Sequence, residues 1–408
     1  MSTTQDARKK FTMATAQVNL YSKSLASVVG KVDTTKMGTV YNPYTSQPAV
    51  SEGAVSSTHI TSTYTAAADS LQINRRADAS EQVNSYDWKS VDFGLLKDRA
   101  ENMGSSISQV IDAYALNTPV GVVTEALDAG DFGGTAGTAY GITSTNVDDV
   151  INLGLTTIHL ANSTEKKFAV VNPYTASSLR SFLQNTGNNV ADNVIVNGIT
   201  SGVTKVGTTF SGVDVFMSNN LTHGAVLALA TNPTDGDTIT INGVVITFLD
   251  TMAGVAGSVH IASTVDITRA NLVEFLTGTN FPGDTTEAEA TDTGYTALSA
   301  DNIGKLSRIS LTAVNDNSAN TATITALGTL TVGETLTDAT DAWGAVYHYM
   351  LLGDYGSINV YIPSQGMDYT ETKVAGKPGR ELYLEQFHNS TVWTKQKDRL
   401  VTVLVKKG

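Results

Sequence analysis

Apolar side chains recur every three or four positions in several long stretches, a spacing that predicts amphipathic helices. The longest covers residues 88–116, where Gly104 in the middle indicates a bend or close packing. The same spacing predicts helices over residues 146–162 and 174–185. Residues 7–30 carry their apolar side chains on one helical face, at Phe11, Ala14, Val18, Tyr21, Leu25 and Val28.

Other stretches alternate with a period of two, which predicts strands. Residues 54–86 alternate weakly and predict two strands with too little apolar content to form a core alone. Such a ribbon needs support, for instance from a neighbouring subunit. Residues 31–47 are interpreted as an irregular linker after an amphipathic arm. A surface helix packed on its own domain fits the pattern of residues 7–30 equally well.

A change in composition interrupts the second half of the chain. Residues 166–221 predict strand, helix and strand, and a similar style resumes at Trp343. Between them, residues 231–342 are rich in Thr, Ala, Gly and Asp, and Asn242–Gly243 suits a type I′ hairpin turn. We interpret this block as a β-rich domain inserted into another. It also predicts strands over 259–261, 309–311 and 321–325 and a short helix capped by Thr268.

Charge is distributed unevenly along the 408 residues, a length that suits two or three domains. The net charge is −13, and residues 231–342 hold 14 acidic and three basic residues, a net charge of −11 that leaves −2 for the rest. Nucleic-acid binding depends on Lys and Arg, so this block is the part least suited to face DNA. Acidity that merely keeps an exposed domain soluble fits the same observation.

Catalytic and metal-binding patterns do not emerge from the sequence. The chain has no cysteine, and its six histidines show no metal-ligand spacing. Pairs such as Asp235 with Asp237 and Asn315 with Asn317 suit turns better than calcium. We therefore expect no enzyme, no cofactor and no metal. No apolar run reaches the ~18 residues of a membrane helix, so we expect a protein that is soluble when made and does not contact a membrane.

The order of these segments resembles the major capsid proteins of tailed phages. Residues 71–88, feeding into a helix that ends at residues 111–116, are similar to their extended loop and spine helix. The helix, strand, helix and strand of residues 146–221 are similar to the axial domain. Residues 355–362 and 399–405 resemble its return into the peripheral domain. The resemblance covers residues 1–230 and 343–408 and depends on element order, since no single motif is strict.

The resemblance implies an α+β chain with the Hong Kong 97-type (HK97-like) capsid fold and an inserted small β-rich domain. The implied divisions are an N-terminal arm (1–45), an extended loop (46–88), spine helix and peripheral domain (89–145), axial domain (146–230), inserted acidic domain on the outer surface (231–342), axial return (343–362) and C-terminal peripheral strands (363–408).

The implied function is that of the major capsid protein of a tailed double-stranded DNA bacteriophage, self-assembling into an icosahedral head. The implied partners are copies of the same chain in hexamers and pentamers, a portal, scaffold or decoration proteins, and packaged DNA in weak non-specific contact. Assembly in the bacterial host cytoplasm and a final place in the virion follow. An encapsulin-like nanocompartment shell protein and a phage tail or adhesion protein with a ligand-binding β module are the alternatives.

Four basic residues are candidate assembly contacts on this resemblance. Arg75 and Arg76 would lie on the extended loop, and Lys377 and Arg380 in a later turn. Arginine suits them because its guanidinium pairs with carboxylates in a bidentate geometry. A solvated strand edge and an ordinary hairpin turn are the competing interpretations. Some capsid proteins of this type cross-link through a Lys–Asn isopeptide bond, but residues 46–88 contain no Lys, so none is expected here.

Overall fold

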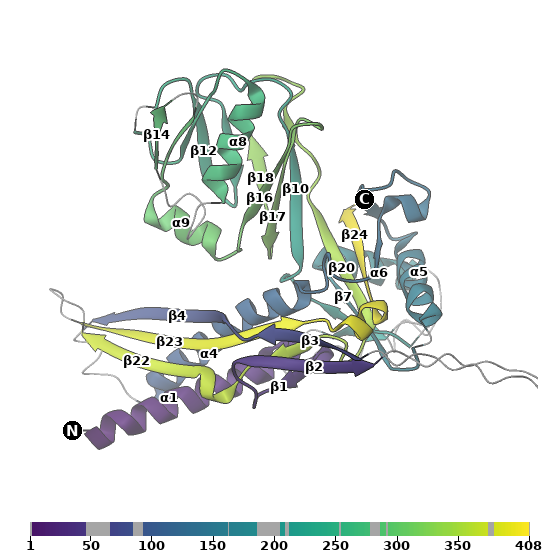
Figure 1. Ribbon diagram of the computed structural model, residues 1–408, viewed down its shortest axis with the longest axis vertical. Helices are drawn as coiled ribbons and strands as arrows, with labels where there is room; N and C mark the ends of the chain where they lie inside the picture. The colour runs from purple at the N-terminus through teal and green to yellow at the C-terminus, as the bar shows by residue number, and fades with distance from the viewer. Residues whose placement is uncertain are drawn as a thin grey trace, which may run out of the picture. The chain divides into compact units, whose positions relative to one another are not determined.

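The computed structural model describes residues 2–45, 66–84, 93–161, 163–185, 205–208, 212–252, 254–277, 286–290, 293–373 and 379–407. The chain divides into two compact units (Figure 1). The first contains Met1–Val123 and Asp354–Leu400, and the second contains Thr124–Thr200, Thr204–Gly353 and Val401–Gly408. Both units mix helices and strands, which confirms the α+β class.

The first unit combines a helical layer with a sheet. Its elements are α1 (Ser2–Lys23), α2 (Leu25–Val29), β1 (Lys31–Asp33), β2 (Thr39–Thr45), β3 (Ala66–Gln72), β4 (Arg75–Asn84), α4 (Phe93–Asn117), β21 (Asn359–Tyr361), η2 (Ser364–Gly366), β22 (Met367–Lys373), β23 (Gly379–Thr391) and η3 (Thr394–Arg399). Strand β23 is central, because β22 and β4 both pair with it antiparallel. Strand β21 pairs with its C-terminal end, and β1 joins β21 in parallel.

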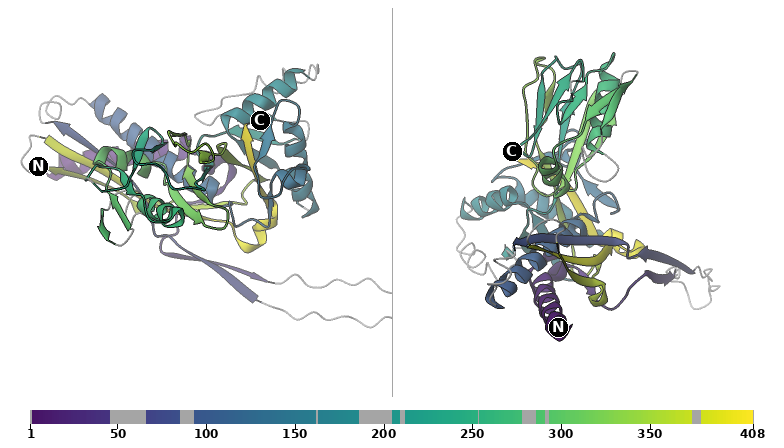
Figure 2. Two further views of the ribbon diagram at one scale, coloured as in Figure 1. Left: turned by 90° about the horizontal axis from the view of Figure 1, so that it is seen from above. Right: turned by 90° about the vertical axis from the view of Figure 1, so that its left-hand side faces the viewer.

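The strands at the start of the chain differ from the sequence prediction. Residues 31–47 were expected to form a linker, but β1 and β2 lie there, ordered by partners that are distant in sequence. The two strands predicted over residues 54–86 exist as β3 and β4, yet they do not pair with each other. Strand β3 pairs with β2, as Figure 2 shows, whereas β4 joins β23. Residues 46–65 and 85–92, which include most of the predicted extended loop, lie outside the described residues.

The second unit holds the remaining elements. They are β5 (Glu125–Leu127), η1 (Ala129–Phe132), β6 (Tyr140–Ile142), α5 (Val147–Leu160), β7 (Lys167–Val171), α6 (Pro173–Asn185), β8 (Lys205–Thr208), β9 (Asp214–Met217), β10 (Thr222–Ala228), β11 (Thr238–Ile241), β12 (Val244–Leu249), β13 (Ser258–His260), α8 (Val265–Leu276), β14 (Glu287–Ala290), β15 (Thr293–Thr296), α9 (Ala300–Ser307), β16 (Thr312–Asp316), β17 (Thr321–Leu327), β18 (Val332–Glu334), β19 (Ala342–Trp343), β20 (Tyr347–Asp354) and β24 (Leu400–Lys407). The helices predicted at 88–116, 146–162 and 174–185 are thus confirmed as α4, α5 and α6.

Two hydrophobic clusters stabilise the second unit. One cluster contains residues of α5, α6, β7, β9 and β24. The other contains residues of β10, β11, β12, β13, β15, β16 and β17 with α8. A sheet in the order β16-β17-β10-β20-β7-β9-β8 contains strands that contribute to both clusters. Strands β14, β15, β13, β12, β11 and β18 form a separate sheet. The domain boundaries at residues 231 and 342 therefore stay a prediction, because β16 and β17 extend a sheet that begins outside them.

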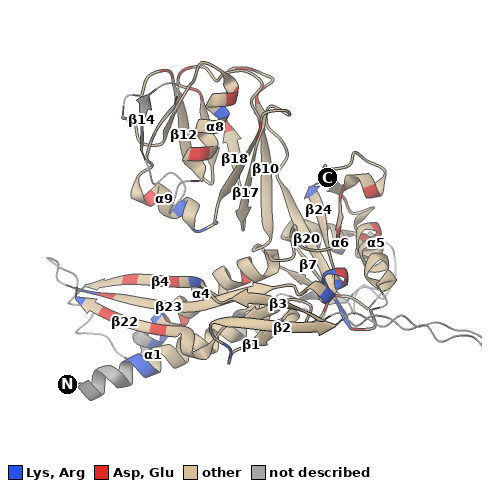
Figure 3. Cartoon of the chain, in the orientation of Figure 1, with Lys and Arg blue, Asp and Glu red and all other residues tan. Residues whose placement is uncertain are grey.

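Local signals within residues 231–342 were partly correct. The hairpin of β11 and β12 is confirmed, and Asn242 and Gly243 have the positive φ values of 49° and 76° that its turn requires. Thr264 rather than Thr268 caps α8, because Thr268 lies inside the helix and is buried. The strand predicted at 309–311 is wrong, since α9 and a turn precede β16. Figure 3 shows the Asp and Glu residues spread over this part of the chain.

Candidate assembly surface

The predicted contact residues lie on the sheet of the first unit. Arg75 and Arg76 begin β4, and Arg380 lies near the start of β23. The register places Arg75 opposite His388 and Arg76 opposite Phe387. Lys377 lies outside the described residues. Because successive side chains on a strand point to opposite faces, the two neighbouring arginines serve different surroundings.

Arg75 packs on the helix that covers the sheet. Its Cζ atom lies 3.9 Å from the ring centroid of Tyr114 in α4, the geometry of a cation–π contact. The ring of His388 meets the same tyrosine edge-on at 5.7 Å between centroids. Burial, and then the charge of Arg75, lower the pKa of His388 to about 4. His388 is therefore a neutral ring at neutral pH, and Arg75 holds β4 against α4.

Arg76 and Arg380 form ion pairs on opposite faces of the sheet, because Arg76 pairs with Phe387 in the register and Arg380 pairs with the buried Val83. Arg76 lies 3.5 Å from Asp78 and 3.7 Å from Glu385, and its side chain is 53% exposed. Arg380 lies 3.1 Å from Glu371, which also accepts a hydrogen bond from the Tyr369 hydroxyl. Figure 3 shows these charges along β4, β22 and β23. All of the described candidates thus have partners in their own chain, and a role between subunits stays a prediction.

The sequence placed the buried face of the first helix incorrectly. Thr12, Ala16 and Leu20 are buried, whereas Phe11 and Val18 are 37% and 68% exposed. The reason is a close crossing of α1 over α4. A Cβ atom added to Gly104 would lie 2.5 Å from the carbonyl oxygen of Ala16, so only small residues fit at the contact. Phe11 and Val18 consequently lie on the more exposed side of α1, whereas Leu20 is buried.

A buried carboxylate joins α2 to α4, and sequence reasoning missed it. Asp112 accepts hydrogen bonds from the Ser24 hydroxyl at 2.6 Å, from the Leu25 N–H at 2.8 Å and from the Ala26 N–H at 3.0 Å. Burial raises the pKa of Asp112 to about 6, although these three hydrogen bonds act to lower it. The acidic residue therefore satisfies the first-turn donors of α2 from a distant helix. Only the unusual placement of an Asp within the apolar pattern of α4 could have signalled it.

Two buried histidines in the second unit pack against each other and against a threonine. The His223 and His348 rings lie 5.7 Å apart across β10 and β20, and His348 Nε2 lies 3.1 Å from Thr175 Oγ1. Burial, and then the proximity of His223, lower the pKa of His348 to about 3. Within the part of the chain that the structure describes, no cluster of three His, Cys, Asp or Glu could hold a metal ion. None of the helices described there has the length and apolar content to span a bilayer.

Residues 81–271 match the family model described as a phage capsid protein. Over these residues, a little less than half of the chain, the protein is similar to the phage capsid protein family. The matched range begins in β4, includes α4, α5 and α6, and ends in α8. The predicted resemblance to phage capsid proteins is therefore confirmed, while the inserted domain stays a prediction. No curated protein matches the chain.

Solved structures of similar shape include several phage particles. The chain is similar to a structure of Mycobacterium phage Ogopogo, with 10% identity, coverage of 94% of this chain and 92% of that chain, and a TM-score of 0.45. A structure of Mycobacterium phage Che8 has 10% identity, coverage of 90% of this chain and 85% of that chain, and a TM-score of 0.43. The capsid of cyanophage P-SCSP1u has 10% identity, coverage of 93% and 87%, and a TM-score of 0.44. Likenesses this weak carry no conclusion about this protein, and the similarity to phage capsid proteins depends on the match over residues 81–271.

Proposed function

We propose that this protein is the major capsid protein of a tailed double-stranded DNA bacteriophage, and that its copies form the hexamers and pentamers of an icosahedral head. The observation that carries the proposal is the family match over residues 81–271. The role is structural, without catalysis. Association of one surface with a different surface of the next copy closes into rings and shells, which is the geometry a head requires.

Exposed apolar and extended segments of the first unit support this function. The outward face of α1, with Phe11 and Val18, would be covered by a neighbouring copy. Strands β2 and β3 form a two-stranded sheet, a structure that is marginally stable alone. Val40 and Ile73 anchor it to Tyr361 and Trp393 at one end. The remainder of the ribbon gains stability if it rests on another subunit.

The proposed partners follow from the same function. They are other copies of the chain, a portal, scaffold or decoration proteins, and packaged DNA in weak non-specific contact. Residues 231–342, with their net charge of −11, would lie on the outer surface because an acidic surface repels DNA phosphates. The shell would assemble in the cytoplasm of the bacterial host and reach its final place in the virion.

Particle formation tests the proposal directly. The full chain expressed in bacteria is expected to elute near the void volume in size-exclusion chromatography and to show closed shells by negative-stain microscopy. Copies recovered from phage particles should enclose DNase-resistant double-stranded DNA, which a nanocompartment with an enzyme cargo or a tail protein would not. A monomer that remains monodisperse at high concentration, with no particles under any assembly condition, would contradict the function.

Arg75, Arg76 and Arg380 are proposed as contacts between subunits. Arg76→Gln should change the unfolding free energy by less than about 1 kcal/mol, because its ion pairs are partly exposed. Arg380→Gln should cost about 1–3 kcal/mol, because its partner Glu371 is only 5% exposed. Each should nevertheless lower shell yield several-fold in the same chromatography. Lys305→Gln is the matched control, since Lys305 also forms a partly exposed ion pair, at 2.9 Å from Asp301. Equal yields for all three variants would show that the arginines act only within their own chain.

A further inference from the structure

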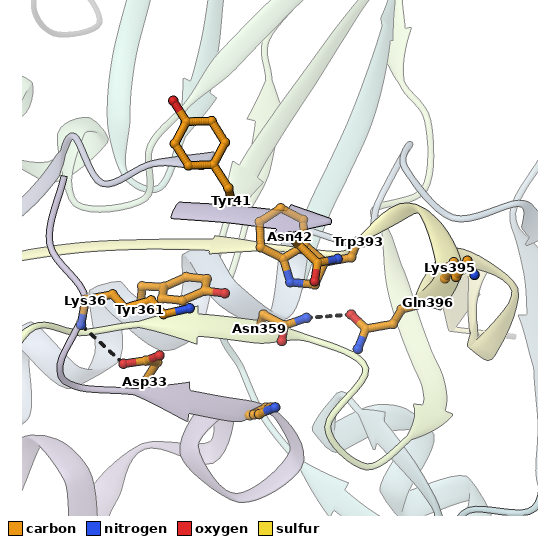
Figure 4. Close-up of a pocket in the computed structure, with 10 residues that line it drawn as sticks. Asp33, Lys36, Tyr41, Asn42, Asn359, Tyr361, Trp393, Lys395 and Gln396 are labelled. Carbon is orange, nitrogen blue, oxygen red and sulfur yellow. Dashed lines mark hydrogen bonds between the residues drawn. The ribbon is translucent and has the colours of Figure 1, made fainter. Parts of the chain in front are cut away.

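A cavity of about 270 Å³ lies within the first unit, away from the candidate contacts. Four segments meet there: β1 with the turn that follows it, β2, β21 and the start of η3. In Figure 4, Lys36 and Asp33 lie at one end of the view and Lys395 at the other. A concave site built from several elements is the ordinary setting for a small ligand.

The charges that line this cavity are mostly positive. It has three lysines, Lys31, Lys36 and Lys395, and a single carboxylate, Asp33. The Asp33 carboxylate is occupied, because its Oδ1 atom accepts hydrogen bonds from Thr35 N and Oγ1 at 2.9 and 2.8 Å. The charge of Lys36 contributes to lowering the pKa of Asp33, after hydrogen bonds that outweigh the opposing effect of burial. Nothing described in the chain forms an ion pair with Lys31 or Lys36.

Lys395 differs from the other two lysines. Its Nζ atom donates to the carbonyl oxygen of Thr45 and lies 5.9 Å from the ring centroid of Tyr44. It therefore secures the ribbon, and the uncompensated charge of the cavity comes from Lys31 and Lys36. Variants of Lys395 can therefore be compared with variants of Lys31 and Lys36 in the same cavity.

The remaining walls are amides and aromatic rings. The Asn359 amide donates to Gln396 Oε1, which leaves the Gln396 N–H₂ group as a donor with a long 3.4 Å contact to the Gly356 carbonyl. Tyr361 and Trp393, each 6% exposed, pack edge to face with 6.4 Å between their ring centroids. Aromatic side chains thus support a polar cavity lined by lysine and amide groups.

We propose that this cavity binds a phosphate group, with Lys31 and Lys36 neutralising its charge and the Gln396 amide donating to an oxygen. Phosphate carries a charge near −2, which matches two unpaired ammonium groups. Lysine binds phosphate as a point charge, and the basic residues that line the cavity are all lysines. The phosphate can come from a free mononucleotide, whose monoester carries a charge near −2, or from a DNA backbone, whose phosphodiesters carry one negative charge each; both present anionic oxygens to the lysines.

Isothermal titration calorimetry on the full chain, with inorganic phosphate, thymidine monophosphate and a short oligothymidylate, tests the proposal. The Lys31→Gln/Lys36→Gln double variant should weaken binding roughly tenfold or more, since each lost contact is charge-assisted. The Lys395→Gln/Lys397→Gln double variant also removes two positive charges, but Lys395 lines the cavity with its ammonium group bonded to Thr45, so this variant should weaken binding by less than about threefold. Tighter binding of the monophosphate identifies a free nucleotide, and tighter binding of the oligonucleotide identifies DNA.

Two outcomes would overturn the phosphate site. One is the absence of saturable binding for all three probes, and the other is an equal loss in the two double variants, which would indicate a general charge effect. If the first double variant fails to fold, Lys36→Gln alone applies the same comparison, because Lys36 lies in an exposed turn. The titration does not require shells, so its result is independent of the proposed capsid function.

Discussion

Replacing Asp112 by alanine is expected to lower the unfolding free energy of the first unit by about 3 kcal/mol at neutral pH. The substitution leaves the Ser24 hydroxyl and the Leu25 and Ala26 N–H groups without their acceptor in a buried place. Each buried donor that loses its partner costs about 1–3 kcal/mol, and partial rearrangement recovers some of that. Urea unfolding followed by circular dichroism measures the difference.

Asp33→Ala is the matched control for this substitution. Asp33 also accepts three hydrogen bonds, from Thr35 N, Thr35 Oγ1 and Lys36 N, but in an exposed turn. Water replaces the lost acceptor there, so the expected loss is below about 1 kcal/mol. Similar losses for the two variants would show that burial does not determine the contribution of Asp112.

The pH dependence of the unfolding free energy gives an independent test of the contribution of Asp112. Its pKa is raised from 3.8 to about 6, so the folded state binds more protons than the unfolded state between these values. The resulting stabilisation is complete below pH 3.8 and is lost as the pH rises through about 6. A shift of this size corresponds to roughly 3 kcal/mol, and Asp112→Asn should remove that slope from the unfolding free energy.

Gly104→Ala is expected to destabilise the first unit by about 2 kcal/mol and to lower the yield of shells, although alanine favours helices. The added Cβ would lie 2.5 Å from the Ala16 carbonyl oxygen and 2.9 Å from its Cα. These are backbone atoms, so α1 itself must move away from α4. The clash outweighs the helix-propensity gain of about 1 kcal/mol. Thermal unfolding and chromatography of the same preparation report both effects.

Gly304→Ala separates this clash from the intrinsic preference of alanine. Gly304 lies within α9, and a Cβ added there meets no atom within 4 Å. This variant should be unchanged or stabilised by up to about 1 kcal/mol. If both glycine variants behave alike, the close crossing of α1 and α4 is not what selects glycine at position 104.

Periodic patterns in the sequence were sufficient to predict those elements whose structure is determined by neighbouring residues. The apolar spacing located α4, α5 and α6, and the Asn242–Gly243 dipeptide located the β11–β12 hairpin, because each signal acts within a few residues. The order of these elements also suggested the capsid family that residues 81–271 match. Family and element type were therefore accessible without coordinates.

Features that depend on residues distant in the sequence could not be predicted. Strand β1 exists because Lys31–Asp33 pair with Asn359–Tyr361, and no local pattern announces that pairing. The outward face of α1 was misassigned because Ala16 meets Gly104, and small side chains mark a close crossing less visibly than large apolar ones mark a core. The cavity lined by Lys31 and Lys36 could not be predicted, since its walls include β21 and η3, which are distant in sequence.

The continuous pairing of β10 with β17 limits how the gene could be edited. Thr222–Ala228 face Thr321–Leu327 over seven consecutive residue pairs, and Ala225 and Leu227 are fully buried in the cluster they share. Deleting residues 231–342 would remove β17, the partner of β10, and would expose the apolar side chains of β10 to water. The Asn242–Gly243 turn is also a poor insertion point, because Asn242 exchanges hydrogen bonds with Thr331 directly before β18.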